Sequence, residues 1–96
     1  MKQVVINPVW GSFHCPEEVQ VKTGMYTYTD KLEDRQNPEL IAWVQQHQDE
    51  TDLIVINLPD TASNICIHED DGMEELSAVI NGKTWWFNDD DYEDRI

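Results

Sequence analysis

The sequence is poor in basic residues. Its 96 residues include only 6 Lys and Arg against 20 Asp and Glu, which gives a formal net charge of −14. A surface of this kind repels nucleic acid and anionic lipid, and it attracts a basic partner quickly at low ionic strength. The shortage of bases therefore argues against direct binding of nucleic acid or of a membrane surface, although the acids also serve solubility.

Long hydrophobic runs and an export signal are also absent. No stretch approaches the roughly 20 apolar residues of a transmembrane helix, and the apolar start is broken by Asn7 and Pro8 and lacks a cleavage site. The two cysteines, Cys15 and Cys66, could form one disulfide. Without an export signal we expect two reduced thiols and a cytoplasmic protein.

Sequence signatures of catalysis are missing as well. The chain has no nucleophile elbow, no Walker loop, no dinucleotide-binding fingerprint and no zinc-protease helix motif. His14 and Cys15 could be a base and a nucleophile, but neighbours in sequence rarely face one another productively. We therefore predict that the protein is not an enzyme and has neither catalytic residues nor a cofactor.

A metal site is the alternative for the same residues. Cys66 and His68 lie two apart on a predicted strand and so share a face, and with His14 and Cys15 they could form a tetrahedral zinc site. The spacing is not that of a zinc finger. A calcium loop centred on Gly72 would place apolar residues at its first and last ligand positions. We predict no bound metal.

The first half of the chain predicts one strand and one or two helices. Residues 3–7 are β-rich and are followed by Pro8, which ends a strand. Acids after Pro16 and the later Gly24 indicate a short helix. A second helix, residues 37–47, has Asn37 as its N-cap and an apolar stripe centred on Trp43, which we expect to be buried.

The second half predicts strands. Residues 53–58, LIVINL, form a continuous β-branched run that is typical of the central strand of a sheet. The alternation in NICIHED places Ile65 and Ile67 on one face, and the Asn-Gly pair at residues 81 and 82 predicts a hairpin. The fold class is therefore α+β: a single small domain, residues 1–88, with an antiparallel or mixed β-sheet, one or two helices packed on one face, and an acidic C-terminal tail, residues 89–96.

Several short motifs follow one another along the chain: Asn7, Trp10, Gly11 and Phe13, then Arg35, Asn37 and Pro38, then Leu58, Pro59 and Asp60, and finally Asp71 and Gly72. In this order they resemble the motifs of a family of small acidic bacteriophage and prophage proteins of unknown function. The family has Gly-Gly-Phe-Gly where this chain has GSFH at residues 11–14. The resemblance implies a phage or prophage origin and expression in the host cytoplasm, and it implies no activity.

The acids form three clusters, at residues 49–52, 69–75 and 89–94, and the last follows two adjacent tryptophans. The total charge is on the scale of a DNA segment of the same length, which permits DNA mimicry. Trp85 and Trp86 must point to opposite faces of a strand, so that one of them can be exposed beside the acids.

These features favour an acidic binding protein that engages and inhibits a host protein with a basic or nucleic-acid-binding surface, such as a defence nuclease. The predicted contact residues are Asp70, Asp71, Glu74, Glu75, Trp86, Asp89, Asp90 and Asp91. The alternative is a small ligand-binding or structural accessory protein whose acids serve only solubility, with a pocket lined by Trp10, Phe13 and His14.

Overall fold

The structure is a computed structural model that describes residues 1–96. In chain order its elements are β1 (Lys2–Ile6), α1 (Glu17–Thr23), α2 (Leu32–Arg35), α3 (Pro38–Gln46), β2 (Ile54–Leu58), β3 (Ser63–Asp70), β4 (Met73–Ile80), β5 (Lys83–Phe87) and the 3-10 helix η1 (Tyr92–Arg95). The predicted α+β class is confirmed, with three α-helices instead of one or two. None of these helices has the length and apolar character needed to cross a membrane.

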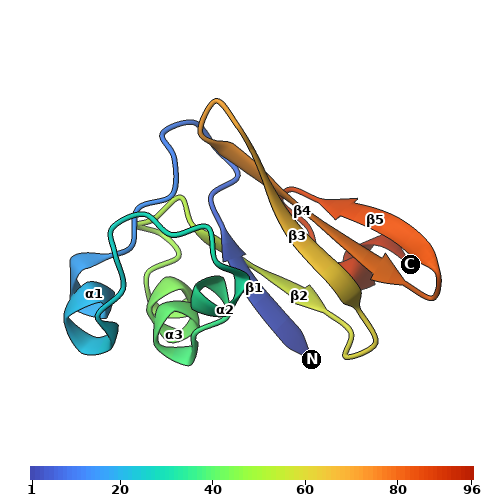
Figure 1. The fold of residues 1–96 in the computed structure, drawn as a ribbon, viewed down its shortest axis with the longest axis horizontal. Coiled ribbons are helices and arrows are strands. Elements are labelled where there is room, and N and C mark those ends of the chain that lie inside the picture. The colour runs from blue at the N-terminus through green and yellow to red at the C-terminus, as the bar shows by residue number, and fades with distance from the viewer.

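The strands form two antiparallel sheets instead of one. β1 pairs with β2 as a two-stranded ribbon, and β3, β4 and β5 form a three-stranded sheet in that order. The three α-helices lie on one side of the ribbon and the three-stranded sheet lies on the other (Figure 1). The ribbon is therefore the middle of three layers.

The position of the ribbon explains its apolar sequence. Val4 and Ile6 of β1 pack in one core cluster with the three-stranded sheet, whereas Val5, which points the opposite way, packs in a second cluster with the helices. All three side chains are fully buried. A strand that is covered on both faces needs apolar residues at every position.

The prediction that residues 53–58 form the central strand of a sheet is wrong. β2 pairs only with β1, so it has one strand neighbour. Its continuous apolar run has the same cause as that of β1, because Ile56 and Leu58 face the three-stranded sheet while Leu53, just before the strand, joins the helical cluster. Burial of both faces produced the pattern, and the pattern does not depend on the number of neighbouring strands.

The local signals for turns and helix ends are confirmed. Asn81 and Gly82, both with positive φ, connect β4 to β5, and Asp71 and Gly72 connect β3 to β4 in the same way. Two consecutive positive φ angles define the hairpin turn whose twist matches that of the flanking strands. At the start of α3, the Asn37 side chain accepts a hydrogen bond from the backbone of Glu39.

Trp43 departs from the prediction for α3. Leu40, Ile41 and Val44 are buried, but Trp43 is only partly buried. One face of its ring stacks on His47, with centroids 4.1 Å apart. Trp43 lies at the edge of the apolar stripe, where α3 faces α1, and it lines a cavity between these two helices.

The predicted acidic tail, residues 89–96, packs on the domain. Asp91 accepts hydrogen bonds from the backbone N–H of Asn57 at 2.7 Å and from its side-chain amide at 2.8 Å, which fixes the segment to β2. Tyr92 contacts Trp85 edge to face, with ring centroids 5.1 Å apart. Part of the third acidic cluster therefore belongs to the folded structure.

A buried ion pair connects the helices, the ribbon and the three-stranded sheet. Arg35, at the end of α2, donates two hydrogen bonds to the carboxylate of Glu74 in β4, at 2.7 and 2.8 Å. It also donates to the carbonyls of Val5 and Thr29. The ring of Phe13 lies 3.6 Å from the guanidinium carbon. This pairing leaves neither charge uncompensated in the interior.

Candidate functional site

The outer face of the three-stranded sheet is here defined as the side that points away from the β1–β2 ribbon. By the strand register and the alternation of side chains it carries Cys66, His68, Asp70, Met73, Glu75, Ser77, Val79, Thr84 and Trp86. The α-helices lie beyond the ribbon (Figure 1), and η1 packs on the inner side through Tyr92. No helix or strand covers the outer face.

Trp86 is held at the centre of this face. Its ring leans on His68, with centroids 4.6 Å apart and planes 38° apart. A nitrogen of His68 is hydrogen-bonded to the Ser77 hydroxyl at 2.7 Å, across the strands. Ser77 is buried beneath these rings, whereas Trp86 remains 48% exposed. An ordered, half-exposed indole of this kind is a common anchor in protein interfaces.

The outer face is acidic and carries neither Lys nor Arg. Asp70 and Glu75 are exposed on it, and Asp71 is exposed in the adjoining turn. None of the 6 Lys and Arg residues occupies the face. The bases nearest in sequence lie elsewhere, since Lys83 and Arg95 approach the ring of Trp85 on the inner side.

A second exposed tryptophan is fixed beside the β3–β4 turn. The Ser12 N–H donates to the Gly72 carbonyl at 3.1 Å, and the Asn7 side chain donates to the carbonyls of both Gly72 and Val9. These bonds tie residues 9–12 to the turn, and the two loops lie side by side in Figure 1. Trp10 is 66% exposed at the end of this loop.

Most residues that carry the family resemblance have structural roles. Asn7 and Gly72 join the two loops, Phe13 and Arg35 belong to the buried ion-pair network, and Asn37 caps α3. Trp10 is exposed, and no hydrogen bond or aromatic contact of its side chain is present. In this chain these residues therefore serve the fold.

The structure separates the predicted contact residues into two groups. Asp70, Asp71, Glu75, Trp86 and Asp89 are exposed, and all but Asp89 belong to the outer face or its turn. Asp70, Asp71, Glu75 and Trp86 therefore share one surface.

The others are engaged within the fold. The prediction that Glu74 contacts a partner is wrong, because this residue is buried on the inner side and paired with Arg35. Asp91 points inward to Asn57. Asp90 is partly buried and lies 3.5 Å from Arg95.

The alternative pocket is not formed as predicted. Phe13 is fully buried under Arg35, and Trp10 projects from its loop. Of the three predicted residues, only His14 lines the cavity between α1 and α3, where it lies with Trp43 and the first turn of α1. Sequence reasoning missed this cavity because it is formed by two helices that are separated in the chain by residues 24–37.

The four groups of the zinc alternative do not come together. Cys66 and His68 share the outer face, as expected, but Cys15 is buried in the helical cluster. No three His, Cys, Asp or Glu side chains are placed to hold a metal ion. The two cysteines are not bonded to one another. Burial, reinforced by Asp34 and opposed by Arg35, raises the pKa of the Cys15 thiol.

Sequence reasoning also missed Ser77, which orients His68 and so supports Trp86. No local pattern marks this serine, because its partner lies nine residues away on the neighbouring strand. No known protein family, curated protein or solved structure matches the chain.

Proposed function

We propose that this protein is an acidic binding protein whose outer face engages a basic surface on another protein. The observation that carries the proposal is the combination of Trp86, held by His68, with the exposed acids Asp70 and Glu75 on an uncovered sheet face without Lys or Arg. An aromatic ring beside carboxylates suits an arginine, which can stack on the ring and pair with an acid.

The biological setting of the proposal comes from the resemblance to phage and prophage proteins. In that setting the protein acts in the host cytoplasm and blocks a host protein, for which a defence enzyme that binds nucleic acid is the best candidate. The net charge of −14 supports fast association with such a surface. A DNA-mimic mode is the stronger form of the same proposal. The protein itself then performs no chemistry.

The test compares two variants that lose the same charge. The outer-face variant carries Asp70→Asn, Asp71→Asn and Glu75→Gln. The control variant carries Asp30→Asn, Glu33→Gln and Glu39→Gln, at exposed positions before α2, on α2 and on α3. A host protein captured by the wild type at low salt should be lost from the outer-face variant and kept by the control. Trp86→Ala should also reduce capture.

Two outcomes separate the forms of the proposal. If duplex DNA competes with capture, the partner uses its nucleic-acid site, as DNA mimicry requires. If both triple variants lose the partner equally, only the total charge matters and the outer face is not the site. Capture that is unchanged in both variants and in Trp86→Ala would refute the proposal altogether.

A further inference from the structure

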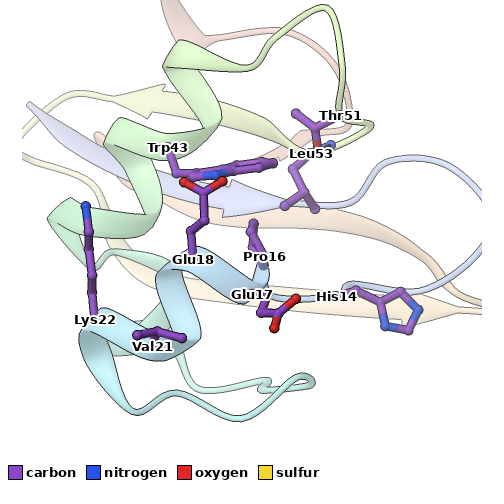
Figure 2. A pocket seen from close by; sticks show the side chains of 9 residues that line it. All are labelled: His14, Pro16, Glu17, Glu18, Val21, Lys22, Trp43, Thr51 and Leu53. Atoms are coloured by element: carbon purple, nitrogen blue, oxygen red, sulfur yellow. Dashed lines mark hydrogen bonds between the residues drawn. The ribbon is translucent and has the colours of Figure 1, made fainter.

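The cleft between α1 and α3 is open to solvent and has the volume of a small-molecule site. Its volume is about 650 Å³, within the usual range of about 300 to 1,000 Å³ for ligand pockets. Trp43 from α3 and Leu53 from the following loop form one side, and Pro16, Glu17 and Glu18 from the start of α1 form the other (Figure 2). This cleft is separate from the outer sheet face, which lies beyond the β1–β2 ribbon.

Trp43 provides an aromatic wall. His47 stacks on one face of the indole, with planes 14° apart, and its Nδ1 is hydrogen-bonded to the Trp43 carbonyl at 2.7 Å. Figure 2 shows the ring lying across the cleft above Glu18 and Pro16. The stacked imidazole fixes the orientation of the indole, which leaves the cleft side of the ring for a ligand.

The charges around this wall favour a cation. Glu17 and Glu18 are both exposed, and the Glu18 carboxylate points toward the indole in Figure 2. The only Lys or Arg in the lining is Lys22, whose amine lies 3.9 Å from Glu39 of α3 and is therefore partly compensated. The remaining titratable group, His14, is hydrogen-bonded to the Gly11 carbonyl.

The Trp43 indole N–H is a second unusual feature of this aromatic wall. Nε1 is buried and has no hydrogen-bond partner, and it is the only buried side-chain nitrogen or oxygen in the protein without one. Such groups are rare in folded proteins, since an unmade hydrogen bond costs about 1 to 3 kcal/mol.

We propose that the α1–α3 cleft binds a small organic ammonium ion. The cation would lie against the cleft face of Trp43, with Glu18 as its counter-ion and with Pro16 and Leu53 against its alkyl groups. Attraction between a cation and an indole face adds about 0.5 to 2 kcal/mol. An ammonium ion without a hydrogen-bonding requirement of its own, such as a quaternary one, suits contacts with Trp43, Pro16 and Leu53 best.

The experiment is a titration with choline, followed by NMR of the four tryptophan indole N–H signals, with Trp43→Phe used to assign the Trp43 signal. The neutral isostere 3,3-dimethylbutan-1-ol serves as the comparison ligand. We expect choline to shift the Trp43 signal with saturation and to bind roughly 10-fold more tightly than the isostere, which corresponds to about 1.4 kcal/mol. Glu18→Gln should weaken choline binding severalfold, whereas Glu33→Gln, with the same charge loss on α2, should leave it unchanged.

Three results would overturn the proposal. Equal affinity for choline and the isostere would mean that the cleft recognises only apolar volume. Equal losses in Glu18→Gln and Glu33→Gln would show that choline responds to net charge alone. Absent or non-saturating shifts of the Trp43 signal would show that no site exists. Because Glu18 and Glu33 are exposed, both variants should keep the wild-type spectrum elsewhere, so that a misfolded variant is recognised at once.

Discussion

At the scale of single residues, Arg35 and Glu74 are the two charged side chains that the fold buries. Both side chains are almost completely removed from solvent, with exposed fractions of 0% and 1%. Burying two charges is costly, and the cost is offset only when each finds its hydrogen-bonding partners. Here the carboxylate accepts from both terminal nitrogens of the guanidinium, and one of its oxygens also accepts from the Asn7 backbone.

We predict that Glu74→Gln lowers the free energy of unfolding by about 3 to 5 kcal/mol, because it leaves the Arg35 charge buried without a counter-ion. The control is Glu75→Gln, one residue away on the exposed face, which should change stability by less than about 0.5 kcal/mol. Urea denaturation of both variants measures the difference. Similar small effects at the two positions would mean that Arg35 does not depend on Glu74.

A second prediction at this scale concerns Cys15. Since burial raises the pKa of its thiol, the folded protein keeps the proton at a pH where the unfolded chain loses it. Stability should therefore fall as the pH rises above the ordinary thiol value of about 8.5. Cys15→Ala should show a smaller alkaline loss than the wild type, and Cys66→Ala, at an exposed site, should behave like the wild type. Urea denaturation from neutral to alkaline pH provides the measurement, and identical slopes in all three proteins would contradict the prediction.

At the scale of the elements, the β3–β4 turn has a requirement that the β4–β5 turn lacks. Gly72 and Gly82 occupy equivalent positions, with φ of +84° and +78°. A Cβ atom on Gly72 would lie 2.9 Å from the Ser12 backbone nitrogen, whereas one on Gly82 would meet nothing within 4 Å. Gly72 thus serves both the turn and its close contact with the Trp10 loop.

We predict that Gly82→Ala costs about 1 to 2 kcal/mol, the usual penalty for a left-handed residue other than glycine. Gly72→Ala should cost clearly more, because the Trp10 loop must also move away from the turn. Thermal denaturation compares the two stabilities. If the β3–β4 turn is part of the binding surface, Gly72→Ala should weaken partner capture more than Gly82→Ala does. Equal destabilisation would show that the loop can shift freely.

At the scale of the whole molecule, the dominant property is charge within a small volume. The chain has a net charge of −14 and measures 38 × 27 × 24 Å. Most of the acids are exposed, so they repel one another across distances comparable to the Debye length of about 10 Å at moderate salt. This repulsion favours expansion of the chain and opposes folding.

We therefore predict that the melting temperature rises as sodium chloride is added from low to moderate concentration. A variant with Asp49→Asn, Glu50→Gln and Asp52→Asn, in the exposed loop before β2, should be more stable than the wild type at low salt and should respond less to salt. Differential scanning calorimetry measures both effects. A melting temperature that is independent of salt in the wild type would show that the acids are too far apart to destabilise the fold.

Sequence alone determined the features that depend on near neighbours. The Asn-Gly and Asp-Gly turns, the cap at Asn37 and the opposite directions of Trp85 and Trp86 follow from backbone preferences and from the alternation along a strand. The α+β class follows from the same signals. The alternation in β4 also puts Glu74 on the face of Leu76, Ala78 and Ile80, a local sign of burial that the prediction of Glu74 as a contact residue overlooked.

Only the tertiary structure decided how the buried charges are paired. The partner of Glu74 lies 39 residues away in the chain, and no local pattern indicates that Arg35 reaches it. For the same reason the sequence could not show that the β1–β2 ribbon is covered on both faces, or that Trp43 lines a cleft opposite Glu18. Contacts between distant segments depend on how the layers pack. That packing is selected by the free energy of burying the whole core, which no short stretch of sequence contains.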